Sequence, residues 1–432
     1  MKVVRRLFAV LCCAVPPVVS AQTLPESILL AINNHPDVER QRVLLEQESV
    51  GLEQIEAGLL PEISASLGVG REDSNNATTR ALVASSAEME RREASLSLSQ
   101  LLFDGKYLHW KQEAQKSAMA AEQAALEATV SEVALRAAEA HFELGRSQSA
   151  LQASAQNFAR HEKVASGIRK RAESGKDDRS KVARVEARLA LSMSNLELAR
   201  AELLQAESLY RSVIGQSPEE LAEEDDIYAS LPSSLSLYLE QVLLDNPRLN
   251  AQRLRVESAE REVSASSSDY FPKLYFESGA SWNDNLDGVR GRNNDAWAML
   301  RLKYDIYQGG VRSARERSAQ LARMETGLQQ ASLERELRRD AEQSWYAMES
   351  AVKRVEFLEN YTLSSEQTVR AYDQQFKIGQ RSLSDLLDAE NELLNARLQY
   401  LRVIKELSLS RLQVLHYTGS MLDQLTLPVT EN

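Results

Sequence analysis

The feature that most constrains the fold is an internal duplication of the sequence. Asn34-His35-Pro36 recurs as Asp245-Asn246-Pro247, and the two prolines lie 211 positions apart. Leu60-Pro61 and Phe271-Pro272 are separated by the same 211 positions. Three later pairs keep an offset of 204, namely Leu102-Phe103-Asp104-Gly105 with Ile306-Tyr307-Gln308-Gly309, Gly175 with Gly379, and Ile214-Gly215 with Thr418-Gly419. Landmarks that recur in one order with a single shift predict two structural repeats built on one plan.

The landmarks also set the domain limits that we expect. Residues 1–21 form a signal peptide, residues 22–215 the first repeat, residues 216–235 a polar linker, residues 236–419 the second repeat, and residues 420–432 a C-terminal tail. Each repeat is expected to hold a helix, a pair of strands and a long helical hairpin. The hairpins are predicted to turn at Gly175 and Gly379, where a helical pattern is interrupted and resumes at once.

The signal peptide is predicted from its own pattern. A basic start precedes an apolar stretch over residues 7–15, which is too short to span a membrane. Small residues end at Ala21, so we expect cleavage before Gln22. The chain has 2 cysteines, Cys12 and Cys13, and both lie in this segment. The mature chain is therefore expected to contain no disulfide and no thiol chemistry.

Within each repeat the apolar pattern changes to period two. Helices are expected over residues 37–59 and 248–269, and four strand patterns follow them. Their apolar positions include Ile63, Ala65, Leu67 and Val69, then Ala94, Leu96 and Leu98, then Leu274, Phe276, Ala280 and Trp282, and finally Ala296, Ala298, Leu300 and Leu302. Strands of about 10 residues with one apolar face can cross an outer membrane when tilted. Residues 75–87 and 286–294 are predicted to be polar hairpin loops.

A soluble sheet packed on a core would give the same alternation, but two observations favour a membrane. The segments around the strands have no spare apolar face to cover a sheet. Aromatic residues gather at the strand ends, as in the girdles of membrane barrels, at Tyr270, Phe271, Tyr275, Phe103, Tyr107, Trp110 and Tyr307. Four strands cannot close a barrel, and an open edge in lipid leaves backbone groups unpaired. The membrane interpretation therefore requires an oligomer that pools its strands.

A very long helix is predicted after each strand pair. Residues 106–174 and 310–378 contain no proline, and a straight helix of that length would reach on the order of 100 Å. Each chain segment then returns, to about Val213 and Tyr417. Apolar residues recur every seven positions along the second return helix, at Leu386, Leu393, Tyr400, Leu407 and Val414, which is typical of a coiled coil. This period fits a hollow helical barrel and a solid bundle equally well.

An acidic step follows the second glycine turn. Asp385 and Asp388 lie three residues apart on the resumed helix and so share one face. Acids also favour the first turn of any helix, so a plain helix start explains the same residues. We expect the functional end of the hairpin here.

A signal peptide, two repeats, and a strand pair with a coiled-coil hairpin in each repeat together resemble the TolC-like family of outer-membrane channels. The most specific motif is Ile378-Gly379-Gln380-Arg381 followed by Asp385-Leu386-Leu387-Asp388. The resemblance implies a mainly α fold with transmembrane β-strands. It also implies a homotrimer whose protomers contribute four strands each to a twelve-stranded outer-membrane barrel, continuous with a long periplasmic α-helical coiled-coil barrel.

The resemblance also implies roles for residues at the hairpin tips. Asp385 and Asp388 occupy positions of acidic rings that constrict the periplasmic pore, and Arg381 matches a residue that holds the inner hairpin closed. The turns at Gly175-Lys176 and Gly379-Gln380 match tips that dock the helical hairpin of an adaptor. The first repeat departs from the best-known member of the family, which has an acid six residues after the first glycine, where this chain has Lys181. Arg184 aligns with Asp388 when the two repeats are aligned. We therefore expect Lys181 and Arg184 to face acidic residues of the second hairpin, with Asp385 and Asp388 as the candidates.

The segments Gly70–Asn76, Thr78–Arg80 and Arg92–Gly105 look most like members that serve type I protein secretion. Such members work with a periplasmic membrane-fusion adaptor and an inner-membrane ABC transporter. The alternative is a multidrug or metal efflux channel that serves an RND-type pump. Besides these proteins, the expected partner is outer-membrane lipid, and the net charge of −12 argues against nucleic acid.

Two other classes of function fit less well. An enzyme is not expected, because the five histidines (His35, His109, His141, His161 and His416) show no metal-ligand spacing and no nucleophile or phosphate-binding motif is present. No cofactor or metal is therefore predicted. A soluble periplasmic coiled-coil adaptor would explain the hairpins and the acidity but not four strands of bilayer length.

Overall fold

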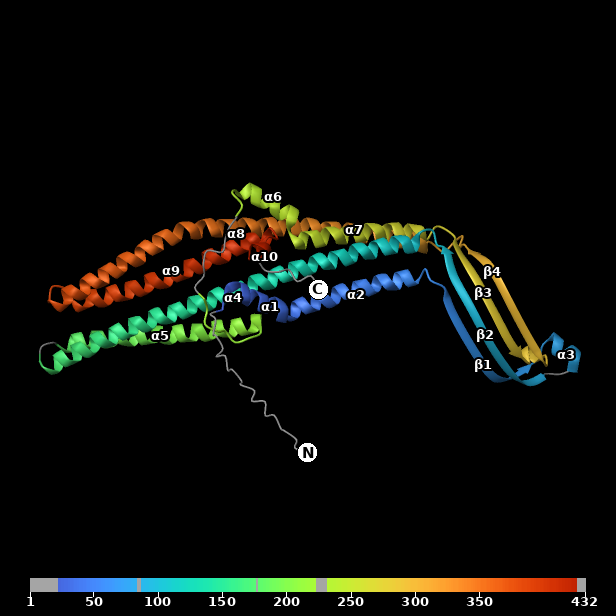
Figure 1. Ribbon diagram of the computed structural model, residues 1–432, viewed down its shortest axis with the longest axis horizontal. Helices are drawn as coiled ribbons and strands as arrows, with labels where there is room; N and C mark the ends of the chain where they lie inside the picture. Colours follow the sequence, from blue (N-terminus) through green and yellow to red (C-terminus); the bar gives the residue numbers. More distant parts are fainter. Residues whose placement is uncertain (1–21, 84–86, 176–177, 223–230, 426–432) are drawn as a thin grey trace, which may run out of the picture.

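The computed structural model describes residues 22–83, 87–175, 178–222 and 231–425. The predicted signal peptide over residues 1–21, Lys176 and residues 426–432 of the predicted tail lie outside the described residues. Figure 1 shows a long, slender bundle of helices that ends in a small sheet.

The two halves of the chain have the same order of elements. The first half contains α1 (Leu24–Asn34), α2 (Pro36–Ala57), β1 (Glu62–Ser74), α3 (Ala77–Val83), β2 (Ala87–Phe103), α4 (Tyr107–Glu173) and α5 (Arg179–Ile214). The second half contains α6 (Leu235–Asp245), α7 (Pro247–Ser268), β3 (Lys273–Asp284), the 3-10 turn η1 (Leu286–Gly288), β4 (Arg292–Lys303), α8 (Val311–Lys377) and α9 (Leu383–Tyr417). The short helix α10 (Met421–Gln424) follows.

The recurring prolines begin the second helix of each half. Pro36 and Pro247 occupy the first helical positions of α2 and α7, where a missing backbone N–H costs nothing. The residue before each proline caps the helix. His35 accepts a hydrogen bond from the backbone N–H of Asp37, and the Asn246 side chain accepts one from the N–H of Leu249.

The four strands form one antiparallel sheet in the order β1-β2-β3-β4. Direct partners lie on the same face, so the register Ala65–Leu96–Ala280–Ala296 places one apolar residue from each strand on one side. The other face is polar. There Ser64 and Ser97 share a hydrogen bond of 2.7 Å, and Arg301 donates to Glu277 at 2.6 Å.

The predicted loops at the far end of the sheet were partly wrong. Residues 75–87 contain the helix α3, and η1 occupies part of residues 286–294. Strand β2 begins at Ala87 and runs for 17 residues, longer than expected. Its polar start is stabilised as a strand by charge pairing across the register, because Arg71 on β1 contacts Glu88 on β2 at 3.2 Å.

The aromatic residues expected at the strand ends all lie at one end of the sheet, where strands meet long helices (Figure 1). Phe103 ends β2, Tyr107 begins α4, and Tyr270 and Phe271 directly precede β3. No helix in the described ranges is long and apolar enough to cross a membrane.

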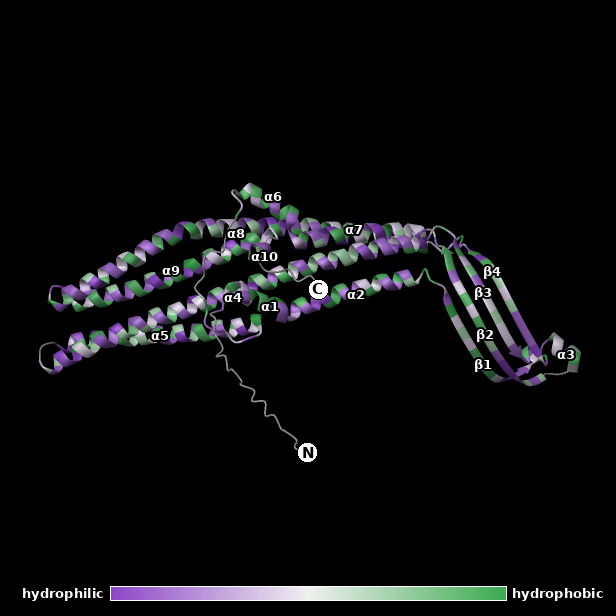
Figure 2. Ribbon diagram, in the orientation of Figure 1, coloured by the Kyte–Doolittle hydropathy of each residue, from purple (hydrophilic) through white to green (hydrophobic). Residues whose placement is uncertain are grey.

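The long helices pair into two hairpins, α4 with α5 and α8 with α9, which lie side by side (Figure 1). Polar and apolar residues alternate along both hairpins in Figure 2, without a long apolar stretch. The main core lies near the middle of the molecule, where α1 packs against α4 and α5. Its members include Ile28, Ala134, Leu144, Tyr210 and Leu412.

A buried chain of hydrogen bonds runs through this core. The Ser27 hydroxyl contacts His141 Nδ1 at 2.8 Å and the Tyr210 hydroxyl at 3.0 Å, and Tyr210 donates to Gln22 Oε1 at 2.7 Å. Burial removes water from the imidazole and lowers the pKa of His141 from 6.5 to about 4. His141 is therefore neutral at neutral pH, and the network fastens the start of the described chain to the two longest helices of the first repeat.

Candidate functional site

The candidate site lies at the end of the bundle opposite the sheet, where both hairpins turn (Figure 1). Each turn is made by a glycine with positive φ, 74° at Gly175 and 80° at Gly379. This left-handed conformation favours glycine because it has no Cβ. At the second turn, Gly379 N–H donates to Phe376 O at 3.1 Å and Gln380 N–H to Gln375 O at 2.9 Å, so these two carbonyls at the end of α8 are capped.

Side-chain caps start the return helices directly after the turns. Asp178 accepts the backbone N–H of Lys181 at 3.0 Å and begins α5, and Ser382 accepts that of Asp385 at 3.2 Å and begins α9. The hydroxyl of Ser180 donates to Asp178 and lowers the pKa of its carboxyl group. Asp385 thus lies in the first turn of α9, where the helix dipole also favours an acid.

Arg381 holds the tip of its own hairpin. Its guanidinium lies 4.0 Å from the centre of the Tyr372 ring on α8. It donates from Nε to Gln375 Oε1 at 3.1 Å and lies 3.7 Å from Asp385 Oδ2. The three contacts fasten the turn to both α8 and α9.

Asp388 makes the charged contact that links the two hairpins at the tip. Its carboxylate accepts a hydrogen bond from Arg188 on α5. Lys181, Arg184 and Arg188 recur at spacings of three and four, so they lie along one face of α5. Among the residues that the structure describes, the ion pair with Asp388 comes from Arg188, one turn beyond Arg184. The same spacing could have identified Arg188 from the sequence, because it is the next basic residue on this face of α5.

An apolar cluster lies beneath this ion pair. Ala165 and Ile168 from α4, Val185 from α5, and Leu383 and Leu387 from α9 are all buried against one another. Leu387 is 1% exposed and precedes Asp388 directly. The contact between the hairpins at the tip therefore combines a buried apolar cluster with a partly exposed charge pair.

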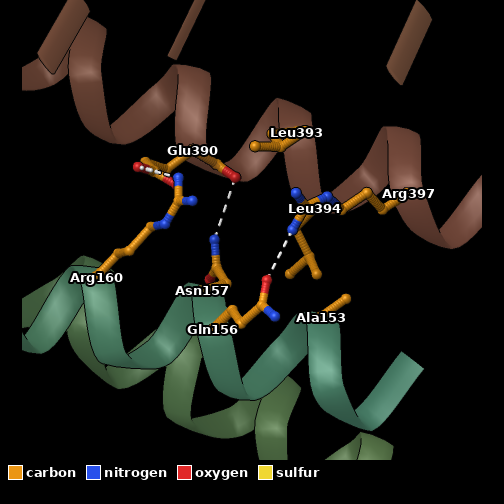
Figure 3. A pocket seen from close by; sticks show the side chains of 8 residues that line it. All are labelled: Ala153, Gln156, Asn157, Arg160, Glu390, Leu393, Leu394 and Arg397. Carbon is orange, nitrogen blue, oxygen red and sulfur yellow. Dashed lines mark hydrogen bonds and ion pairs between the residues drawn. The ribbon is translucent and has the colours of Figure 1, made fainter. Parts of the chain in front are cut away.

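Farther from the tip the seam between α4 and α9 is polar (Figure 3). Arg160 donates to both carboxylate oxygens of Glu390 at 3.1 and 3.2 Å, and Asn157 donates to the backbone oxygen of Glu390 at 3.1 Å. Arg397 donates to Gln156 at 3.0 Å and to Glu366 on α8 at 2.5 Å. Together with Lys405 and Glu143, 2.7 Å apart, these residues connect the hairpins along the seam.

Two buried polar atoms at this seam, Asn157 Oδ1 and His161 Nε2, have no hydrogen-bond partner among the described residues. Sequence reasoning did not identify the seam, since its members come from three helices far apart in the chain. No group of three or more potential metal ligands occurs within the described ranges.

The sequence pattern of a family described as "Outer membrane efflux protein" matches residues 28–216 and 238–420, most of the chain. The chain belongs to this family. The efflux protein BepC of Brucella suis is 23% identical over 417 residues, covering 95% of this chain and 88% of BepC. The outer membrane protein TolC of Vibrio cholerae is 24% identical over 381 residues, covering 85% of this chain and 84% of TolC.

Solved structures show the same fold. The outer membrane channel CmeC of Campylobacter jejuni superposes with a TM-score of 0.80 at 16% identity, covering 92% of this chain and 86% of CmeC. The predicted fold class, mainly α with a transmembrane β part, is confirmed. The protein is an outer-membrane channel that extends into the periplasm, and it is not an enzyme.

Proposed function

We propose that this chain forms the exit duct of a tripartite export machine, gated at its periplasmic tip by Asp385 and Asp388. The observation that carries the proposal is the tip itself, where a glycine turn, a capped helix start and two acids on one face stand at the end of each protomer. Three copies would place two stacked rings of carboxylates across the pore, which favour cations and repel each other. Arg381 and Arg188 offset that repulsion within each protomer.

A trimer would also pair the backbone groups at the two edges of the sheet. Its two outer strands, β1 and β4, each leave one row of backbone groups unpaired within the protomer. Pairing β4 of one copy with β1 of the next would close a barrel of twelve strands and leave no edge in lipid.

The tips also support docking of partner proteins. Gly175 and Gly379 have open space around the position of a Cβ, so both turns are accessible to another chain. We propose that these turns, with Lys176 and Gln380, receive the helical hairpin of a periplasmic adaptor, and that the adaptor joins the duct to an inner-membrane ABC transporter. The proposed cargo is protein, exported by type I secretion, because the segments Gly70–Asn76, Thr78–Arg80 and Arg92–Gly105 resemble members with that role.

A second candidate is the export of small molecules through an RND-type pump. The names of the family and of BepC, which both describe efflux, favour it. Deletion of the chain in its host would distinguish the two. Loss of proteins from the culture medium with unchanged drug and metal tolerance supports secretion, whereas the reverse supports efflux.

The gate is tested by conductance of the purified protein in a planar bilayer, beside Asp385→Ser and Asp388→Ser. Wild type is expected to conduct little and to prefer cations, and both variants are expected to conduct more with weaker selectivity. A wild type that conducts widely, with variants that match it, would place the constriction elsewhere.

A further inference from the structure

A pocket of about 460 Å³ lies where the sheet meets the long helices. Phe103 and Lys106, from the end of β2 and the turn that follows, and Trp110 on α4 form one wall. Ser264 and Phe271, from α7 and the turn after it, form the other. The volume suits a small organic ligand or a part of a lipid.

The register of the sheet indicates which side this pocket faces. A register shift between Leu101 and Phe103 brings Phe103 opposite Leu274 on β3, which pairs with Leu302 on β4. Direct partners point to the same side, so Phe103 continues the apolar face of the sheet. In an outer-membrane channel that face contacts lipid. The pocket is also formed next to the two inner strands, away from the edges where neighbouring protomers pair.

The backbone at Lys106 is unusual. Lys106 has φ of 71°, a left-handed conformation that costs any residue with a Cβ. The other non-glycine residues with positive φ in the described ranges are Asn285 and Asp287, which tolerate it better. At the equivalent turn of the second repeat, the same position is Gly310, with φ of 87°. The first repeat therefore has a lysine in a strained conformation at the position where the second repeat has a glycine, which adopts it without strain.

The turn is held in this conformation by its neighbours. Gly105 has φ of 73°, and a Cβ at Gly105 would lie only 2.6 Å from Cβ of Phe271 and 2.9 Å from Ser268 O. The tight packing of Gly105 against this segment fixes the direction in which Lys106 leaves the backbone. Strained residues that the surrounding structure holds in place are typical of binding sites.

The charge of Lys106 is available for a ligand. The nearby cations are engaged by carboxylates, because Lys111 contacts Glu262 at 2.8 Å and Lys273 lies 3.9 Å from Asp269. Within the part of the chain that the structure describes, no ion pair engages the Lys106 ammonium group. A cation beside aromatic rings at the boundary of a membrane matches the phosphate, glycerol and first methylenes of a phospholipid.

We propose that this pocket binds a phospholipid of the periplasmic leaflet, with its phosphate at Lys106 and its acyl chains along the apolar face that Phe103 continues. Figure 1 places this junction at the helical end of the sheet, and the helices extend into the periplasm. The site would fix the depth of the channel in the membrane. It is independent of the cargo and of the gate.

The test measures thermal unfolding of the purified full-length channel in detergent, with and without added phosphatidylglycerol. The variants are Lys106→Gly, Lys106→Arg and Lys303→Gly, and Lys303 is an exposed lysine at the same end of the sheet but on its polar face. Phosphatidylglycerol is expected to raise the Tm of wild type, Lys106→Arg and Lys303→Gly. The shift should fall to less than half in Lys106→Gly, whose Tm without lipid should not fall because glycine relieves the strain.

Inorganic phosphate and diacylglycerol, each at the same concentration, distinguish the parts of the ligand. Neither is expected to reproduce the shift, since one lacks the chains and the other lacks the phosphate. A full lipid shift in Lys106→Gly would overturn the proposal. An equal shift with inorganic phosphate would overturn it too, by revealing an anion site that does not recognise lipid.

Discussion

The hairpins α4–α5 and α8–α9 follow one plan, yet their tips carry opposite charges. After its glycine turn the first hairpin presents Lys181, Arg184 and Arg188 along α5. The second presents Asp385 and Asp388 at matching places on α9. Duplication followed by a change of sign allows one repeat to hold the other, because like charges at both tips would repel across the seam.

The repeats also differ near the middle of the molecule. In the first repeat Ser27 hydrogen-bonds to the buried imidazole of His141. At the duplicate positions of the second repeat, Tyr238 stacks on Trp345 with ring centres 5.6 Å apart. The first repeat is thus fastened here by a polar network around His141, and the second by stacked rings together with a hydrogen bond of 2.9 Å between the hydroxyls of Tyr238 and Ser344.

The two longest helices, α4 and α8, also differ in the side chains that they bury and expose. Helix α4 buries a long series of alanines, which lets α2, α5, α7 and α9 approach it closely, whereas α8 exposes large side chains such as Leu328 and Phe357. Within the protomer α4 is the helix against which these four helices pack. The second hairpin contacts it through the polar seam and the apolar cluster at the tip.

The largest effect on local stability is expected from the apolar cluster that joins the two hairpin tips. Leu387→Ala removes a side chain that is 1% exposed and should cost about 2–5 kcal/mol of local stability by leaving a cavity. Ile378→Ala, at a tip residue that is 68% exposed, should cost far less. Hydrogen exchange of α9 backbone amides near the tip would measure both. Equal protection in the two variants would contradict the assigned packing.

The pH dependence of stability should come from two buried histidines, His141 in the first repeat and His416 in the second, because burial lowers the pKa of each to about 4. The folded pKa of His141 is about 4 and the unfolded value about 6.5, so the unfolded state binds the extra proton as pH falls. The contribution of His141 is fully present above pH 6.5 and should drop by about 2 kcal/mol at pH 5. Denaturant unfolding at pH 7.5 and pH 5 measures the difference. His141→Gln should weaken this dependence and leave the part that His416 contributes, and a slope unchanged by that substitution would assign the titration to other groups.

A smaller effect on stability is expected from the charge pair at the tip. Arg188→Ala with Asp388→Ala in a double-mutant cycle should give a coupling of about 0–1 kcal/mol, since both side chains are partly exposed. The matched control is Arg354 with Glu406, which are 2.8 Å apart but join α8 to α9 within one hairpin. Conductance should rise in the tip variants and stay unchanged in the control. A rise in both would mean that the charge pair at the tip has no special role in gating.

Much of this architecture was predictable from local patterns. The duplicated prolines and glycines mark helix starts and turns because few other residues satisfy those backbone conformations. The pairing of Arg188 with Asp388 was not predicted, since the alignment of the repeats favours Arg184 and only the packing of α5 against α9 selects the next turn. Helix α3 was missed because a helix of 7 residues is too short to show an apolar period.

The most direct test of the account is a reversible crosslink across the tip, Arg188→Cys with Asp388→Cys. With Cys12 and Cys13 in the predicted signal peptide, the mature chain is expected to carry no competing thiol. The account predicts that the disulfide forms under oxidation, that the oxidised channel conducts less in a planar bilayer than the reduced one, and that reduction restores the current. A crosslinked channel that conducts as freely as its reduced form would contradict a gate at this contact, and failure of the two cysteines to join would contradict the contact itself.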